Sequence, residues 1–407
     1  MPLLKDLKTG WGVARGLLAT RKARRKLAHQ VSQIDTLAPG SVKIGVYFAD
    51  EKVNLYQLRQ WYAPMLELSS TYPVAILARN PGSAVALYKE SPLPVAYVNK
   101  VEDLERFIAA QDLHIVFYVN QNSRNFQMFR YGRMWHVFIN HGESDKMYMT
   151  TNQFKAYDYS LVAGEAARIR LGSKLWDFDL DTRTIQIGRP QADHFAGELP
   201  YEPDDRTVVL YAPTWEGDRA SAAYGSIASH GVALVTALLE SGRHRVIYRP
   251  HPRSGVRDHD YKHAHEQIVS AINAANAKDP AAHHVYDHGK ELGWQLAAAD
   301  VAITDISAMV YDRLATGKPL IVTRPVSAAA EVDETGYLGA CEWLTADAAA
   351  AIVGAVDRVL TSDDAQRTLR FWVERHFGDT TPGKATERFH DAVNTLVARW
   401  EEFAAKG

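Results

Sequence analysis

Two histidines in the sequence directly follow predicted strands, where a side chain can reach a ligand. His141 comes after an apolar run and precedes Gly142, and a glycine lets the backbone turn away while the imidazole faces the ligand. His251 stands between two prolines, which restrict the backbone around it. An imidazole changes charge near neutral pH, so both side chains can take part in proton transfer. A purely structural role is the alternative at each position.

A third segment, residues 300–325, has the pattern of a phosphate-binding turn. The apolar residues 301–304 predict a buried strand that stops at Asp305, and residues 307–315 have helical spacing. The first amides of such a helix lack partners within the helix and attract an anion. Asp305 and Ser307 therefore either cap the helix or bind a phosphate, and ordinary capping is the simpler interpretation.

Three more polar side chains follow predicted strands. Arg189 can clamp a phosphate or pair with Asp193, Thr214 offers a hydroxyl and an amide, and Arg249 adds a cation near His251. Because the carboxyl ends of parallel strands share one edge of a sheet, we expect these side chains to face a common cleft.

The composition describes a chain with more than one domain and no disulfide framework. The chain has 407 residues, of which 46% are hydrophobic, enough for two substantial cores. The net charge of −2 argues against a protein that coats nucleic acid. Cys341 is the single cysteine, and no cysteine–histidine spacing indicates zinc. No apolar run approaches the ~20 residues that span a bilayer, so we expect a cytoplasmic or peripheral protein.

Apolar runs alternate with helical patterns along most of the chain. This alternation predicts two α/β domains with mostly parallel sheets. The predicted domains are residues 39–190 and 191–407, the second with closing C-terminal helices, and a basic segment, residues 1–38, precedes both. The first strand series comprises residues 43–48, 72–77, 95–98, 115–119, 137–139, 159–162 and 185–188. The second comprises residues 208–212, 245–248, 284–286, 301–304 and 320–322.

Residues 1–30 contain eight lysines and arginines and one acid, Asp6. Apolar residues recur there at three- and four-residue steps, which predicts one apolar stripe with cations beside it. Such a helix can lie on an anionic membrane. A helix packed on its own domain and a disordered basic tail are the alternatives.

Taken together, these segments resemble the family of CDP-glycerol glycerophosphotransferases, the teichoic acid polyol-phosphate primases and polymerases. The resemblance covers about residues 135–325, and its pieces stand in the order of the family. They are Asn-His-Gly-Glu-Ser-Asp-Lys at 140–146, Gly-Arg-Pro-Gln-Ala-Asp at 188–193, Tyr-Ala-Pro-Thr-Trp at 211–215, His-Pro at 251–252, Thr-Asp-Ile-Ser-Ala at 304–308, Asp312, and Thr-Gly-Lys-Pro at 316–319.

The resemblance implies a GT-B fold, two Rossmann-like domains around a cleft, with the CDP-activated donor on the C-terminal domain and the acceptor over the N-terminal one. Glycerol phosphate would pass to a hydroxyl of a lipid-linked or polymeric acceptor, releasing CMP at the cytoplasmic face of the membrane. His141 would be the general base, and His251, if protonated, would stabilise the diphosphate. The other donor-binding residues would be Arg189, Thr214, Arg249, Asp305, Ser307, Ala308 and Asp312. This set of charges would need no metal or other cofactor.

Three departures from the family pattern leave the donor polyol open between glycerol, ribitol and others. Asn140 replaces a tryptophan, residues 143–145 replace Thr-Pro-Leu, and Ala308 replaces a serine. Two other functions remain: a GT-B glycosyltransferase that uses a nucleotide sugar, and a non-catalytic membrane-binding protein on the same scaffold.

Overall fold

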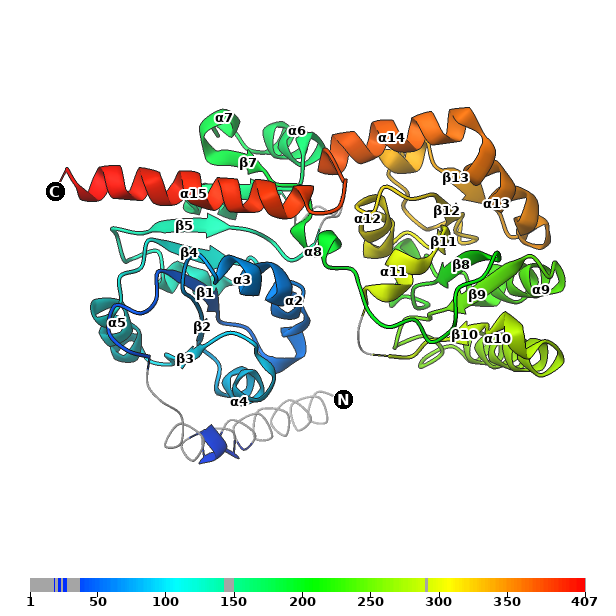
Figure 1. The fold of residues 1–407 in the computed structure, drawn as a ribbon, viewed down its shortest axis with the longest axis horizontal. Coiled ribbons are helices and arrows are strands. Elements are labelled where there is room, and N and C mark those ends of the chain that lie inside the picture. The colour runs from blue at the N-terminus through cyan, green and yellow to red at the C-terminus, as the bar shows by residue number, and fades with distance from the viewer. Residues whose placement is uncertain are drawn as a thin grey trace, which may run out of the picture.

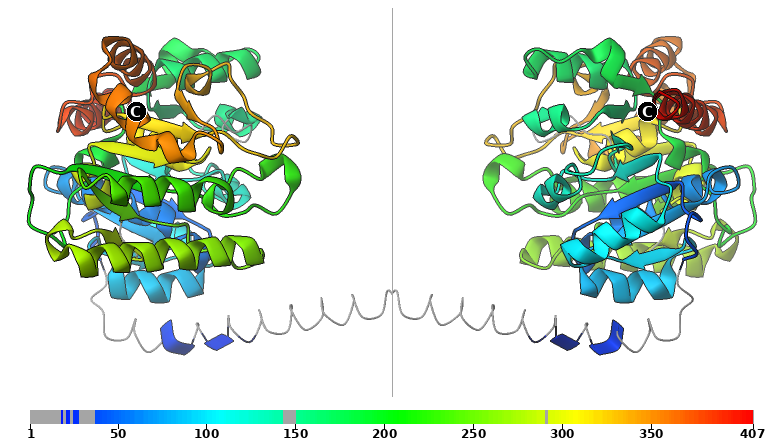
Figure 2. Two further views of the ribbon diagram at one scale, coloured as in Figure 1. Left: turned by 90° about the vertical axis from the view of Figure 1, so that its right-hand side faces the viewer. Right: turned by 90° about the vertical axis from the view of Figure 1, so that its left-hand side faces the viewer.

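Two α/β domains lie side by side in a computed structural model that describes residues 18, 21–22, 25–27, 37–142, 150–289 and 292–406 (Figure 1). Each domain has a parallel sheet with helices on both faces, and Figure 2 shows these layers from two further sides. The predicted fold class of two α/β domains is therefore confirmed.

The N-terminal sheet has seven parallel strands among the described residues. These strands are β1 (Ile44–Phe48), β2 (Val74–Ala78), β3 (Val95–Tyr97), β4 (Ile115–Tyr118), β5 (Trp135–Phe138), β6 (Tyr159–Val162) and β7 (Thr184–Gln186). Their order is β3-β2-β1-β4-β5-β6-β7. The central strands are buried on both faces, which is why they read as continuous apolar runs in the sequence.

The C-terminal sheet has six parallel strands among the described residues. They are β8 (Thr207–Ala212), β9 (His244–Tyr248), β10 (Val285–Tyr286), β11 (Val301–Thr304), β12 (Leu320–Thr323) and β13 (Glu342–Leu344), in the order β10-β9-β8-β11-β12-β13. The sequence did not predict β13, because a three-residue edge strand that begins with Glu342 has no apolar run.

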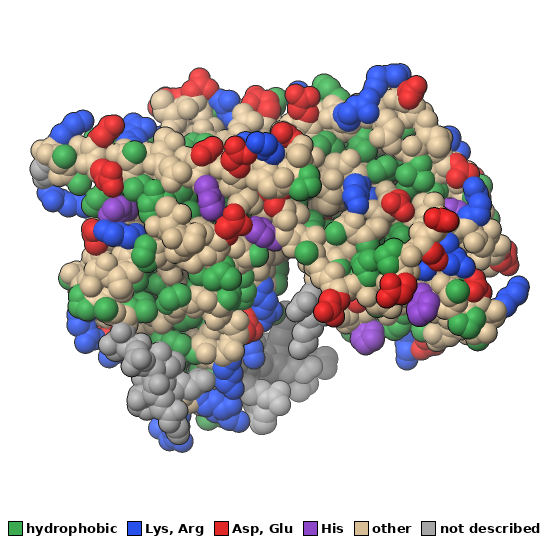
Figure 3. All heavy atoms as spheres, viewed as in Figure 1, with side chains coloured by type: hydrophobic (Ala, Val, Ile, Leu, Met, Phe, Trp, Pro, Cys, Tyr) green, Lys and Arg blue, Asp and Glu red, His purple; other side chains and the backbone are tan. Residues whose placement is uncertain are grey.

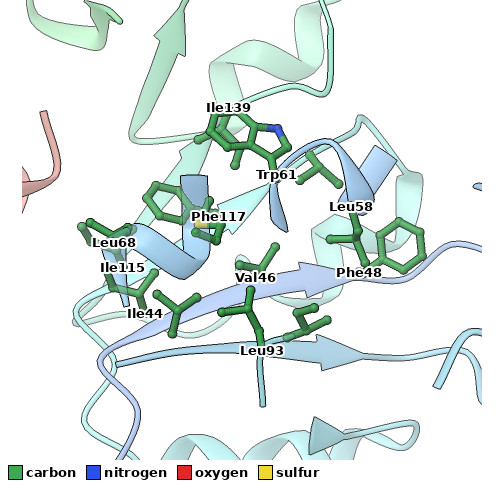
Figure 4. Close-up of a cluster of buried hydrophobic side chains, with 14 of the residues drawn as sticks. Ile44, Val46, Phe48, Leu58, Trp61, Leu68, Leu93, Ile115, Phe117 and Ile139 are labelled. Atoms are coloured by element: carbon green, nitrogen blue, oxygen red, sulfur yellow. The ribbon is translucent and has the colours of Figure 1, made fainter. Parts of the chain in front are cut away.

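Helices cover both faces of the N-terminal sheet. One face carries α2 (Tyr56–Arg59), α3 (Tyr62–Leu68) and α4 (Pro81–Glu90), and the other carries α5 (Val101–Ala110), α6 (Glu165–Lys174) and α7 (Leu180–Arg183). Alternate residues of β1 enter the two cores: Val46 packs on the first face and Tyr47 on the second. In the first core, Trp61 lies beside Ile139, which follows β5 and stands two residues before His141 (Figure 4).

Helices also cover both faces of the C-terminal sheet. One face carries α9 (Val232–Glu240), α10 (His259–Lys278) and α13 (Ile352–Thr361), and the other carries α11 (Trp294–Ala298), α12 (Ala308–Leu314) and α14 (Asp363–Phe377). The predicted helix after Asp305 is thus confirmed as α12, which begins after Ser307.

The last helix, α15 (Lys384–Ala404), leaves the C-terminal domain and packs along the N-terminal one (Figure 1). The Trp135 Nε1 atom donates to the Leu396 carbonyl at 2.9 Å, and Phe389 is fully buried against the first sheet. Our expectation that the C-terminal helices close residues 191–407 is therefore wrong for α15. Its amphipathic pattern predicts the helix but does not say which core its apolar face covers.

The chain passes between the domains through a short helix, α8 (Pro190–Asp193). Gly188 precedes it with φ +70°, and a Cβ atom there would meet the Phe377 carbonyl oxygen at 3.0 Å, so this position requires glycine. The Asp193 carboxylate accepts from the amide and the hydroxyl of Thr386, at 2.7 and 2.8 Å. This contact fixes the first residues of α15 to the hinge.

Among the described residues, none of the helices combines the length and the hydropathy that crossing a bilayer requires. The predicted membrane-binding segment, residues 1–30, lies almost wholly outside the described residues.

Candidate active site

His141 lies at the carboxyl end of β5 in the N-terminal domain, as predicted. The preceding residue, Asn140, has φ +56°, and its carbonyl accepts a hydrogen bond from the Trp61 indole. The His141 ring is held by a 2.8 Å hydrogen bond from Nδ1 to the Val119 carbonyl oxygen. Because a carbonyl can only accept, Nδ1 carries the proton and Nε2 presents a lone pair.

The surroundings of His141 favour its neutral form. Burial lowers its pKa below 6.5, and the positive charge of Arg189 lowers this pKa further, against the opposing effect of the Val119 hydrogen bond. At neutral pH the imidazole therefore has an unprotonated Nε2 that can accept a proton.

His251 lies at the carboxyl end of β9 in the C-terminal domain. Its amide donates to the Pro213 carbonyl at 3.1 Å, and its Nδ1 accepts from the Arg253 amide at 3.1 Å. Here Nδ1 is the acceptor, so in the neutral ring Nε2 carries the proton and is a donor. The two histidines therefore have opposite tautomers.

The pKa of His251 is also lowered, first by burial and then by the charge of Arg253, while Glu216 opposes the shift. This direction disfavours the protonated His251 that we considered from the sequence. The neutral ring can still donate one hydrogen bond through Nε2.

The loop that carries His251 is held by Glu216 and Trp215. The Glu216 carboxylate accepts from the amides of Gly255, Arg257 and Asp258 at 3.0, 2.9 and 3.2 Å. The Arg253 guanidinium lies 3.7 Å from the centre of the Trp215 ring. Trp215 and Glu216, which follow β8, therefore position the loop after β9.

Asp305 is completely buried, and its role differs from the predicted one. Its carboxylate accepts from the Thr214 amide at 2.7 Å, from the Ser226 amide at 3.1 Å and from the Thr323 hydroxyl. Burial raises its pKa to about 6, against the effect of these donors. Asp305 neither caps α12 nor reaches the surface, so it acts by positioning the loops after β8 and β11.

Ser307 is the residue that caps α12. Its hydroxyl accepts from the Met309 amide at 3.2 Å, and Ala308 is exposed at the start of the helix. The amide of Thr214 is already bonded to Asp305, so of the two groups predicted there only the hydroxyl remains for a ligand.

Arg249 is also committed to a neighbour. Its guanidinium pairs with Asp287 and donates to the Gly289 carbonyl at 3.2 Å. Asp287 in turn accepts from the Gln295 amide group. This network holds Arg249 at the carboxyl end of β9, two residues before His251.

Arg189 forms a buried ion pair across the hinge, with Asp312 on α12 rather than with Asp193. The Arg189 Nη2 and Asp312 Oδ1 atoms are 2.5 Å apart, and the two side chains are 7% and 10% exposed. Arg189 also donates to the Gln60 side chain at 3.5 Å. Two residues that we predicted to bind the donor thus bind each other and connect the domains.

The surface is hollowed between the two domains (Figure 3). A small cavity of about 50 Å³ lies at the hinge beside Asn140, Gly142 and Arg189, which is room for water rather than for a nucleotide. Among the described residues, no group of three or more histidine, cysteine or acidic side chains is arranged to hold a metal ion.

Two residues near His141 were missed because the sequence before Arg133 carries no motif. Tyr56 meets the His141 ring edge-on, with the ring centres 5.8 Å apart, and Gln60 contacts Arg189. Both follow β1 in the helical region of α2. The available signal was their position after a buried strand at the same edge of the sheet as His141.

Comparison with known proteins assigns the family. Residues 137–395 match the model of the CDP-glycerol:poly(glycerophosphate) glycerophosphotransferase family. No curated protein matches the chain. A solved structure of the wall teichoic acid polymerase TagF is 14% identical, with 95% of this chain and 99% of that chain covered and a TM-score of 0.57. A UDP-GlcNAc 2-epimerase from Neisseria meningitidis, bound to UDP-GlcNAc, is 11% identical, with 87% and 100% covered and a TM-score of 0.56.

The two structural similarities concern the fold alone, and they confirm the expected GT-B architecture. The family match extends further, because it covers more than half of the chain, including both histidines and the hinge. The protein therefore belongs to the CDP-glycerol:poly(glycerophosphate) glycerophosphotransferase family, and it is a transferase of that kind.

Proposed function

We propose that this protein transfers glycerol phosphate, or a related polyol phosphate, from a CDP-activated donor to an acceptor hydroxyl and releases CMP. Family membership supports the reaction class. The observation that carries the detailed proposal is the pair of opposite tautomers, with a proton acceptor at His141 and a proton donor at His251.

His141 acts as the general base. An alcohol is a poor nucleophile until its proton is removed, and the Nε2 lone pair of His141 can remove it as the bond to phosphorus forms. The lowered pKa keeps this lone pair free at neutral pH. A positioned base of this kind contributes ~10²–10⁴-fold to the rate.

His251 donates from Nε2 to a phosphate oxygen of the donor, where negative charge grows as CMP leaves. Transfer of a phosphoryl group depends mainly on positioning and on neutralising this charge. The Thr214 hydroxyl and the start of α12 at Ser307 and Ala308 complete the donor site, and the ion pairs that hold Arg189 and Arg249 lie beside it. Asp305 and Asp312 contribute by holding Thr214 and Arg189 in place.

The reaction proceeds without a metal ion in this proposal, in which the His251 Nε2 donor and the amides at the start of α12 bind the phosphate oxygens. The acceptor is a lipid-linked or polymeric polyol phosphate that enters over the N-terminal domain. The enzyme then works as a peripheral protein at the cytoplasmic face of the membrane, with residues 1–30 on the anionic lipid surface and no nucleic-acid partner.

The test is CMP release from CDP-glycerol and CDP-ribitol, with UDP-sugars as competing donors and EDTA present in a parallel series. His141→Ala and His251→Ala should each lose at least ~10²-fold in kcat while circular dichroism shows an intact fold. His263→Ala is the matched control, because His263 is exposed on α10. Near-normal turnover in both site variants, or turnover with UDP-sugars alone, would refute the proposal.

A further inference from the structure

A second pocket lies at the carboxyl edge of the N-terminal sheet, away from the histidines. It has a volume of about 820 Å³ and is lined by residues that follow β2, β3 and β4, among them Arg79, Lys100 and Arg124. A pocket of this size can hold a small ligand. Its lining contains four cations, which also include Arg106, and two acids.

Arg79 is the unusual residue of this pocket, because its guanidinium is buried without a carboxylate. The residue is 5% exposed. Its Nη atoms donate to the Tyr47 hydroxyl at 2.8 Å, the Asn99 carbonyl at 2.9 Å and the Gln127 side chain at 3.0 Å. Among the described residues no acid pairs with it, and its Nε has no hydrogen-bond partner. A buried cation is unfavourable unless acceptors satisfy all of its donors or an anion joins it.

Arg313 shows what a purely structural buried arginine looks like in the same chain. It is completely buried and donates to the carbonyls of Pro319, Leu296, Ala299 and Asp300, at 2.7–3.1 Å. Its Nε and both Nη atoms all have partners. Arg79 differs from Arg313 because its Nε has no hydrogen-bond partner. Arg79 also lines a pocket, beside the exposed cations Lys100 and Arg124.

The acids in the lining do not neutralise Arg79. The Asp103 carboxylate accepts from the Lys100 amide at 3.2 Å and pairs with Arg106 at the start of α5. Glu102, the other acid of the lining, is exposed, so the four cations and two acids leave a net charge of +2 around the opening. This net positive charge indicates an anionic ligand with several oxygen acceptors, such as a phosphate group.

The position of the pocket relates it to the acceptor. Three strand spacings separate β2 from β5, which corresponds to roughly 14 Å between Arg79 and the strand that presents His141. One polyol phosphate is too short to occupy both places. We propose, on the basis of the function proposed above, that this pocket binds a phosphate of the acceptor at a distance from the reacting hydroxyl.

The acceptor phosphate can come from a soluble polyol-phosphate chain or from a lipid headgroup, and two probes distinguish these sources. Binding of the full chain is measured to a soluble glycerol phosphate oligomer and to phosphatidylglycerol vesicles, with phosphatidylcholine vesicles for comparison. The variants are Arg79→Gln and the double variant Lys100→Gln/Arg124→Gln. Arg130→Gln is the control, because Arg130 is an exposed cation nearby that does not line the pocket.

The proposal expects the double variant to bind one of the two anionic probes at least ~10-fold more weakly than the control variant does. Weaker binding of the glycerol phosphate oligomer identifies the ligand as a polymer phosphate. Weaker binding of phosphatidylglycerol vesicles alone identifies it as a lipid headgroup. The double variant changes only the exposed residues Lys100 and Arg124 and keeps the buried Arg79. The test therefore remains valid even if Arg79→Gln does not fold. Equal binding by the double variant and the control, for both probes, would overturn the proposal.

Turnover separates this inference from the function on which it rests. With an anionic acceptor, the double variant should raise the acceptor KM by ~10-fold or more and leave the donor KM unchanged. If the unaltered protein turns over no CDP-polyol, the proposed reaction fails, while the binding comparison still decides whether the pocket holds phosphate.

Discussion

The buried ion pair between Arg189 and Asp312 predicts strong energetic coupling across the hinge. At an effective dielectric constant near 20, two charges about 4 Å apart attract each other by about 4 kcal/mol, before the cost of desolvating them. Both side chains are at least nine-tenths buried. Removing one partner leaves a buried charge alone and costs about 3–5 kcal/mol.

A double-mutant cycle measures this coupling. We expect Arg189→Met and Asp312→Leu each to destabilise the protein by about 3–5 kcal/mol, and the combination to cost far less than their sum. Urea unfolding followed by circular dichroism gives the midpoints for all four proteins. If the cost of the double variant equals the sum of the two single-variant costs to within about 0.5 kcal/mol, the two side chains do not interact and this reasoning is refuted.

The pH dependence of the stability of Arg189→Met provides an independent check. Burial already raises the pKa of Asp312, and Arg189 opposes that shift. In Arg189→Met the folded state therefore holds the Asp312 proton more tightly than the unfolded state, whose aspartate pKa is about 3.9. Stability should fall as pH rises from about 3.9 through the raised native pKa, and then level off. A loss of stability in Arg189→Met that is the same on both sides of this window would contradict the assignment.

Three further predictions concern the loops and the histidines. The acid side of the pH profile of kcat/KM, measured by CMP release, should have an apparent pKa below 6.5. Burial and the charge of Arg189 lower the pKa of His141, so the base stays unprotonated as the pH falls. A higher apparent pKa would count against His141 as the base. Arg253→Pro removes the amide N–H that fixes the His251 tautomer and should lower kcat by ~10-fold or more. Arg253→Ala keeps this amide and should lower kcat less. Equal losses of kcat in the two variants would show that the Arg253 amide does not set the tautomer. Asp305→Leu leaves the three donors that bind the Asp305 carboxylate without their acceptor and should cost at least about 1–3 kcal/mol in thermal unfolding experiments. An unchanged melting temperature would exclude the positioning role.

The sequence predicted the central strands well because they are buried on both faces and read as uninterrupted apolar runs. It failed for β13 and for the packing of α15. The edge strand β13 begins with Glu342 and has no such run. An amphipathic helix does not specify which of two sheets it covers. A sequence pattern alone therefore does not show which of two neighbouring domains a helix packs against.

The candidate site was predicted in its positions but not in its pairings. The side chains of His141, His251 and Ser307 do lie at the carboxyl edges of the two sheets. Asp305 and Arg189 also follow strands, yet the fold buries both and gives each a partner more than 75 residues away. A strand-end position shows that a side chain can reach the cleft, whereas its burial depends on neighbours that the local sequence does not name.

The two histidines show how the backbone can give one residue type two roles. The Nδ1 atom of His141 meets the carbonyl of Val119, and the Nδ1 atom of His251 meets the amide of Arg253. A carbonyl fixes the proton on Nδ1 and an amide excludes it, so Nε2 is an acceptor in one ring and a donor in the other. Phosphoryl transfer to an alcohol needs one group of each kind, a base for the hydroxyl and a donor for the departing phosphate oxygen. The two rings belong to different domains, so the function proposed above requires that both of them reach the same phosphate.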